Sequence, residues 1–192
     1  MNNITLPEEK LLKWFKLNVK YGIVSKKDNR KIIYNKFVID EETERKFQDL
    51  CWSDYILQQP DEFKKSKVGL CFDQALYSYS ELNKYYKSNM YFIQQYCEGY
   101  VHLFTVYEKD NLFYRFENSL YDTSINTEFN IYEHKNLNDL LNKVYKILEV
   151  NYPINKGFGA NIVEPFKLLN KKLNYKEALE KCGFSESKHL CK

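Results

Sequence analysis

Three side chains of this sequence could act together in a nucleophilic reaction: the thiol of Cys71, the imidazole of His102 and the carboxylate of Glu117. Apolar residues at helical spacing run from Phe72 to Leu82, which predicts that Cys71 lies in the first turn of a helix. The positive end of a helix dipole lowers the pKa of a thiol and favours the nucleophilic thiolate. Such a thiol needs a base. His102 is the histidine that falls in a predicted strand, whereas His134 and His189 lie in polar segments.

A predicted hairpin brings the acid to the base. Residues 99–117 contain two runs of β-branched and aromatic residues on either side of the polar segment "EKDN". If two residues, Lys109 and Asp110, or the four residues of "EKDN" form the turn, His102 lies directly opposite Glu117. The carboxylate could then accept a proton from one imidazole nitrogen and leave the other to face Cys71. A loop of odd length without a bulge would place the two residues on opposite faces.

The residues around the thiol suggest how a carbonyl substrate would be held. Gly69 fits a tight turn that lets a substrate carbonyl approach, and the backbone N–H of Cys71 would point toward the carbonyl oxygen. Asp73 in the first turn complements the helix dipole. Candidates for a second oxyanion donor or for substrate contact are Trp52, Gln58, Gln59 and Gln74.

The remaining periodicity predicts an α+β fold. Helices are expected over residues 5–22, over 41–57 with Pro60 ending it, over about 137–148, and over 174–182 with Gly183 as the C-cap. A lysine-bearing loop is expected before residue 67, and "NKGFGANIVEPF" is interpreted as a glycine-bearing loop. Residues 1–60 are predicted to form a helical region packed on the core, and residues 61–192 the core with a helical extension, together one globular unit.

Composition excludes several classes of protein. The chain has 192 residues and its apolar fraction is 44 %, yet no apolar run is long enough to cross a membrane. The acidic residues near the N-terminus argue against a secretory signal, so a cytoplasmic location is predicted. The net charge of +3 comes from interleaved charges, so no nucleic-acid partner is expected. The cysteines include no C-x-x-C pair and there is no glycine-rich phosphate loop, so neither a metal nor a cofactor is predicted.

The segments "GLCFDQA", "HLF" and "FENS", which carry Cys71, His102 and Glu117, resemble the core of the transglutaminase-like superfamily. The resemblance covers about residues 66–150 and is strongest to small bacterial proteins whose cysteine motif reads like Gly-x-Cys-Trp-Asp-Gln. Phe72 stands where Trp is usual, and Glu117 replaces the common Asp and is one methylene longer. Residues 1–60 and 151–192 match no family that we can name.

The resemblance implies a papain-like architecture, in which a cysteine-bearing helix packs on a small antiparallel sheet. It also implies a Cys-His-Glu triad that forms an acyl-enzyme with an amide of a protein or peptide substrate. Resolution by water would make the protein a cysteine peptidase or other amide hydrolase such as a deamidase, and resolution by an amine would make it a transglutaminase. Arylamine acetyltransferases use the same kind of triad, but the arginine-rich segment that precedes their cysteine is missing from this sequence.

Two other classes of function remain open. A catalytically inactive member could keep the fold and bind a peptide or protein, and it would lack thiol reactivity at Cys71. An interaction protein could use its lysines to meet an acidic partner, and it would gather them on one face.

Overall fold

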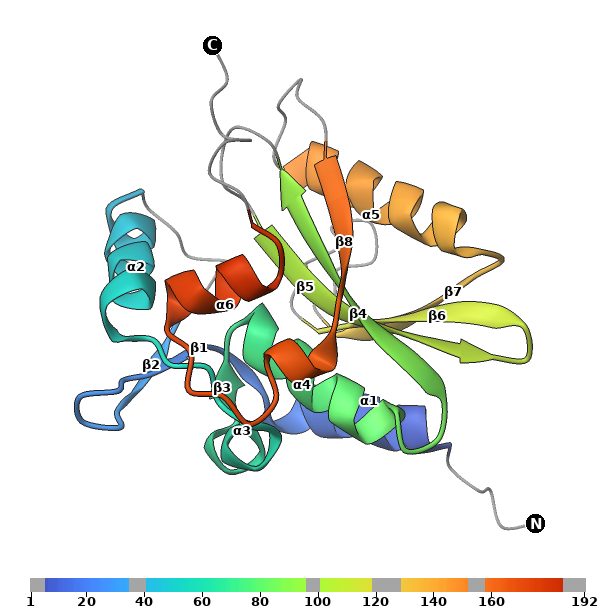
Figure 1. Cartoon of the computed structure of the whole chain (residues 1–192). Coiled ribbons are helices and arrows are strands. Elements are labelled where there is room, and N and C mark those ends of the chain that lie inside the picture. The colour runs from blue at the N-terminus through green and yellow to red at the C-terminus, as the bar shows by residue number, and fades with distance from the viewer. Residues whose placement is uncertain (1–5, 35–40, 96–100, 119–128, 152–157, 185–192) are drawn as a thin grey trace.

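The computed structural model describes residues 6–34, 41–95, 101–118, 129–151 and 158–184. Within them, helices and antiparallel strands are mixed, so the predicted α+β class is confirmed (Figure 1). The helices are α1 (Pro7–Asn18), α2 (Glu41–Asp54), α3 (Pro60–Ser66), α4 (Cys71–Leu82), α5 (Leu137–Asn151) and α6 (Tyr175–Lys181), with a short 3-10 turn at Pro165–Lys167. None of the helices in these ranges is both long and apolar enough to span a membrane.

The larger sheet has the strand order β7-β6-β5-β4-β8, and every neighbouring pair is antiparallel. Its strands are β4 (Lys87–Gln95), β5 (Val101–Lys109), β6 (Leu112–Glu117), β7 (Asn130–His134) and β8 (Phe158–Val163). The hairpin of β5 and β6 is confirmed. The loop expected at "NKGFGANIVEPF" is wrong for residues 158–163, because β8 forms there. β8 is an edge strand that pairs only with β4 in the described sheet, and its glycine weakens the strand signal in the sequence.

A smaller sheet leads the chain into α4. It contains β1 (Lys20–Val24), β2 (Lys31–Ile33) and β3 (Val68–Gly69) in the order β2-β1-β3. β1 and β2 are antiparallel and enclose the predicted polar turn, whereas β3 runs parallel to β1. Because β3 ends two residues before Cys71, its pairing with β1 fixes the position from which α4 starts.

The helices before residue 67 differ from the prediction in three places. The first helix ends at Asn18 rather than near residue 22, because residues 20–24 join the small sheet as β1. The segment after Pro60, expected to be a loop, forms α3. Pro60 occupies the first turn of that helix, where a missing backbone N–H is tolerated and the fixed φ of proline is already helical. Proline therefore begins α3 and does not end the second helix, which stops at Asp54 instead of the predicted residue 57.

The two faces of the larger sheet are covered by different helices, α4 and α5 (Figure 1). On one face, Thr105 of β5 donates a hydrogen bond to the carbonyl of Ala75 in α4, at 3.0 Å. On the other face, Phe104 and Val106 pack in a buried cluster with Leu140 and other residues of α5. Successive residues of a strand point to opposite faces. Even-numbered residues of β5 therefore face α5, and odd-numbered residues face α4.

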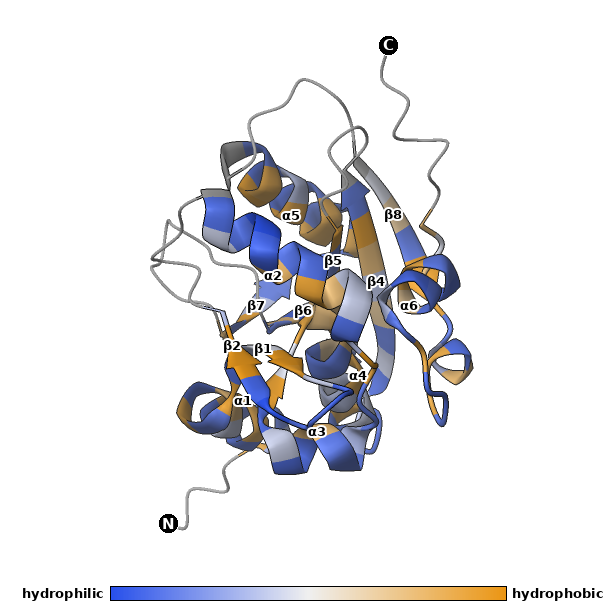
Figure 2. Cartoon of the chain, turned by 90° about the vertical axis from the view of Figure 1, so that its left-hand side faces the viewer, coloured by the Kyte–Doolittle hydropathy of each residue, from blue (hydrophilic) through white to orange (hydrophobic). Residues whose placement is uncertain are grey.

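The N-terminal segments pack on this core. Phe15 of α1 is fully buried, and its ring lies 5.2 Å from Phe116 and 6.0 Å from Tyr77, measured between centroids. α2 is largely hydrophilic (Figure 2), and it buries Phe47 and Cys51 against the core. β1 also pairs with β3, so the small sheet joins the parts before and after residue 60. The division at residue 60 stays a prediction.

Candidate functional site

The turn between β5 and β6 lies one residue later than predicted. Asp110 and Asn111 form it, with φ values of 52° and 60°, and Lys109 pairs with Leu112. Asp and Asn adopt this left-handed conformation more readily than Lys, which explains the position of the turn. The predicted direct opposition of His102 and Glu117 is therefore wrong. The last recorded pair is Thr105 with Phe116, and continuing this register places Glu117 diagonal to His102.

The two side chains nevertheless meet, because the shift of register is an even number of residues and keeps them on one face. The imidazole Nε2 of His102 lies 2.9 Å from Glu117 Oε1. Both side chains are buried, with exposed fractions of 2 % and 1 %. An ionised Glu117 can only accept hydrogen bonds, so with it Nε2–H would be the donor and Nδ1 of the neutral ring would carry the lone pair. The predicted contact between base and acid is confirmed, while their catalytic roles stay predictions.

Glu117 has further partners that the sequence does not indicate. The backbone N–H of Asn118 donates to Oε1 at 2.9 Å, and Nη1 of Arg115 lies 3.3 Å from Oε2. The Arg115 side chain is fully buried, and its guanidinium lies over the ring of Tyr132, 4.2 Å from the centroid. Two residues apart on β6, Arg115 and Glu117 share a sheet face. The carboxylate is thus held between a histidine and a buried cation.

Cys71 is the first residue of α4, as predicted. The residue is 5 % exposed and belongs to a buried apolar cluster that includes Leu103, Cys51 and Cys182. Asn118 connects the two halves of the candidate site, because its Nδ2 donates to the carbonyl oxygen of Cys71 at 3.4 Å. The residue that follows Glu117 therefore touches the first turn of the cysteine helix.

The imidazole and the thiol belong to different sides of the sheet. The His102 ring stacks on Phe104 at 5.5 Å between centroids, on the face that α5 covers. Cys71 packs with Leu103, on the face that α4 covers. We predicted that the second imidazole nitrogen faces Cys71. Because the two side chains lie on opposite faces of the sheet, that nitrogen could reach the thiol only around the end of β5.

Asp73 is the most highly connected side chain at the start of α4. Its carboxylate is fully buried and accepts hydrogen bonds from the backbone N–H groups of Leu70 and Gln58, each at 2.8 Å, and from the Tyr55 hydroxyl at 3.0 Å. Burial raises its pKa to about 7, although these hydrogen bonds act in the opposite direction. Asp73 therefore ties the start of the cysteine helix to the segment that follows α2. An acid at the third helical position is the sequence signal for this capping.

Gly69 makes room for Asp73 rather than for a substrate. A Cβ atom at residue 69 would lie 2.6 Å from Asp73 Cβ and 2.8 Å from a ring carbon of Phe63. The space that we assigned to a substrate carbonyl is filled by these two side chains. The predicted reason for the glycine is therefore wrong, and the close packing of α3 against α4 replaces it.

The three candidate glutamines direct their amide groups to backbone carbonyls. Gln58 donates to Val68 at 2.7 Å, and Gln74 donates to Gly69 at 2.8 Å. Gln59 donates to the carbonyls of Leu168 and Lys171, at 3.2 and 2.8 Å, so it holds the segment that precedes α6. These contacts account for each glutamine as a structural residue, and an oxyanion role stays a prediction.

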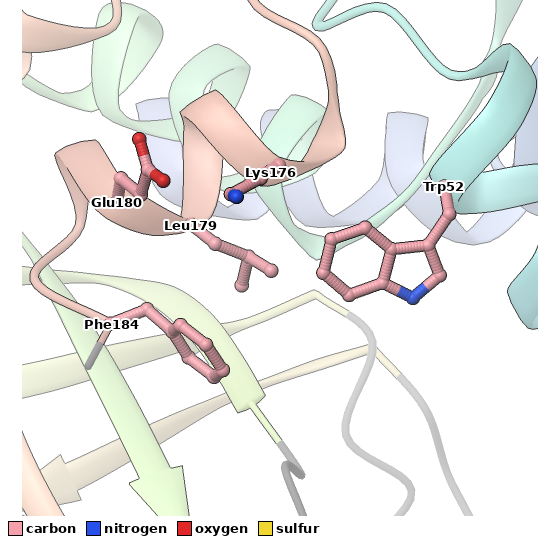
Figure 3. A pocket seen from close by; sticks show the side chains of 5 residues that line it. All are labelled: Trp52, Lys176, Leu179, Glu180 and Phe184. Atoms are coloured by element: carbon pink, nitrogen blue, oxygen red, sulfur yellow. The ribbon is translucent and has the colours of Figure 1, made fainter. Parts of the chain in front are cut away.

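Trp52, the fourth candidate, lines a surface pocket between α2 and α6. The indole is 51 % exposed and faces Leu179 and Phe184, with Lys176 and Glu180 completing the lining of a cavity of about 230 Å³ (Figure 3). The ring of Tyr175 lies between this pocket and α4, 5.1 Å from Trp52 and 5.9 Å from Phe72 between centroids. Trp52 thus lies one aromatic ring away from the first turn of α4.

The other described cysteines are buried thiols. Burial raises the pKa of Cys51 to about 12 and that of Cys182 further still. Cys97, Cys191 and His189 lie outside the described residues. Within the ranges that are described, no three His, Cys, Asp or Glu side chains gather as metal ligands.

Comparison with known proteins identifies no relative: no family model, no curated protein and no solved structure matches the chain.

Proposed function

We propose that the chain has a papain-like core of the transglutaminase-like kind and is a cysteine-dependent amide hydrolase or acyl transferase, with Cys71, His102 and Glu117 as its triad. The observation that carries the proposal is the buried hydrogen bond between His102 and Glu117, at 2.9 Å, next to a residue that contacts the first turn of the Cys71 helix. A carboxylate that fixes the tautomer of an imidazole is how an oriented general base is built.

In this mechanism the Cys71 thiolate attacks the carbonyl carbon of a protein or peptide amide, and a C–S bond forms. N–H groups of the first turn of α4 point out of the helix N-terminus and would stabilise the oxyanion. The protonated His102 gives its proton to the departing amine as the C–N bond breaks, and an acyl-enzyme results. Water releases the acid in a peptidase or deamidase, and an amine releases a new amide in a transglutaminase. The reaction needs the imidazole and the thiol to meet, so Nδ1 of His102 would have to reach Cys71 around the end of β5.

The second candidate function is an inactive transglutaminase-like fold that binds a peptide or protein. A specific observation favours it: residue Cys71 is only 5 % exposed, and the imidazole lies on the opposite face of the sheet. In that case the hydrogen bond between His102 and Glu117 stabilises the fold, and Cys71 is an ordinary apolar side chain of the core.

One experiment distinguishes the two functions. The rate of alkylation by a small haloacetamide is measured for each cysteine between pH 5 and pH 9, and the modified residues are located by mass spectrometry. The enzyme proposal expects Cys71 to react with an apparent pKa at least about one unit below the ordinary 8.5, faster than the buried Cys51 and Cys182. His102→Ala should then raise the apparent pKa of Cys71 while the circular dichroism spectrum is unchanged.

The urea-unfolded chain is the control, because all its thiols should react alike. If Cys71 in the folded protein is as slow as Cys51 and Cys182, the triad does not operate and the binding function is favoured. If His102→Ala leaves the pKa of Cys71 unchanged, His102 is not its base.

A further inference from the structure

Arg115 is the only described arginine that is fully buried, and its environment is unusual for a cation. None of its guanidinium nitrogens has a well-aligned hydrogen bond to another described residue. Among the described residues, the guanidinium lies over the ring of Tyr132, and its Nη1 lies 3.3 Å from Glu117 Oε2. A buried charge is unfavourable unless an opposite charge compensates it. The carboxylate of Glu117 is the compensating group.

The two oxygens of Glu117 have different partners. Oε1 accepts from His102 Nε2 and from the Asn118 backbone N–H, each at 2.9 Å, whereas Oε2 faces Arg115. The strand geometry produces this division, because Arg115 is two residues from Glu117 on the same face of β6 and His102 is its diagonal neighbour on β5.

Asp73 is a buried carboxyl group that has no cation recorded beside it among the described residues. Asp73 is also fully buried, and the hydrogen-bond donors recorded for it are all neutral. Burial raises the pKa of Asp73 to about 7. A cation within ion-pair distance acts in the opposite direction, since it favours the charged form of a carboxyl group.

We propose that Arg115 is a positioning residue that keeps Glu117 ionised, so that its Oε1 oxygen accepts the hydrogen bond from His102. The inference deepens the proposed function and rests on it, because an orienting carboxylate can stabilise an imidazolium only while it is charged. Without the cation, Glu117 would take up a proton and His102 would lose the partner that fixes its tautomer.

The other charged groups on this side of the sheet are less suited to the task. His134 of β7 is buried, and burial and the nearby Arg115 lower its pKa, so it is neutral near pH 7. Asp139 of α5, 58 % exposed, lies 3.4 Å from His134 Nδ1, and Lys143 of α5 is exposed and acts on the same histidine. Within the described ranges, Arg115 is therefore the buried group beside Glu117 that stays charged at every pH of interest.

The test is nuclear magnetic resonance of the full chain, labelled with 13C and 15N, in the wild type and in Arg115→Met. The carboxyl signal of Glu117 is assigned by its loss in Glu117→Gln, and the ring signals of His102 by their loss in His102→Ala. We expect the carboxyl midpoint of Glu117 to rise by at least about one pH unit in Arg115→Met. Arg115→Lys, which keeps the charge, is the matched control and should stay within about half a unit of the wild type. An unchanged midpoint in Arg115→Met overturns the proposal.

A double variant keeps the proposal testable if Arg115→Met does not fold. Removing Glu117 as well, in Arg115→Met with Glu117→Gln, takes away the carboxylate that needs a cation, so the double variant should regain a cooperative thermal transition. A double variant as unfolded as the single one would mean that Arg115 acts by packing alone, and the proposal would be wrong. The alkylation experiment tests the proposed function separately. If the Glu117 midpoint shifts in Arg115→Met but Cys71 is unreactive, the enzyme proposal is wrong and the proposed effect of Arg115 on Glu117 is still supported.

Discussion

The buried carboxyl group of Asp73 should make the stability of the protein depend on pH. Its pKa rises from 3.8 to about 7 on folding because the group leaves water. Between these two values the folded chain holds a proton that the unfolded chain has released. The free energy of unfolding therefore falls as pH rises through this window.

The size of the effect follows from the shift of the pKa. Each pKa unit corresponds to about 1.36 kcal/mol, so a rise from 3.8 to about 7 corresponds to about 4 kcal/mol over the whole window. That is a large part of the stability of a typical domain. The protonated carboxyl can still be satisfied, because the Tyr55 hydroxyl, 3.0 Å away, can turn from donor to acceptor.

The assay is urea unfolding at a series of pH values from 4.5 to 8, for the wild type and for Asp73→Asn. Asparagine imitates the neutral carboxyl but turns an N–H group toward that of Leu70, which should lower stability by about 1–3 kcal/mol at every pH. The difference between the two proteins in the free energy of unfolding, followed as a function of pH, therefore reports the titration of Asp73 alone. His134, whose lowered pKa acts with the opposite sign, is present in both proteins and cancels.

Asp49→Asn on the exposed side of α2 is the matched control and should parallel the wild type at every pH. If the free energy of unfolding of Asp73→Asn changes with pH in parallel with that of the wild type, the folded protein does not hold a proton on Asp73. The hydrogen bonds from the backbone and from Tyr55 would then outweigh desolvation, and our account of the start of α4 would need to be replaced.

Three further substitutions test the packing around the site, each by urea unfolding. Gly69→Ala should destabilise the protein by about 1–3 kcal/mol, because its Cβ would lie 2.6 Å from Asp73 Cβ, and a neutral effect would contradict this close packing. Thr105→Val should lower stability by about 1–2 kcal/mol, because it removes the hydroxyl that lies 2.7 Å from Ser78 Oγ between β5 and α4. Leu140→Ala in α5 should lower stability by about 2–5 kcal/mol, since the side chain is fully buried, and a loss below 1 kcal/mol would mean that α5 does not cover this face.

Local patterns in the sequence determine several features of this protein. The apolar stripe after Cys71 places the thiol at the first residue of α4, and Gly183, with a φ of 92°, follows the last helix as its C-cap signal predicts. A hairpin loop with an even number of residues puts His102 and Glu117 on one face of the sheet. These features depend on residues close together in the chain, whose periodicity and turn chemistry act before any long-range packing.

Tertiary structure decides which groups surround that pair. The packing of α5 on one face of the sheet and of α4 on the other puts His102 on the side away from α4. Arg115 is buried under a contact with Tyr132 of β7, and Asp73 is hydrogen-bonded to the segment after α2, so both environments depend on contacts between different elements. A period of two fixes which residues share a face but not which helix covers it, because that depends on how remote apolar surfaces pack together.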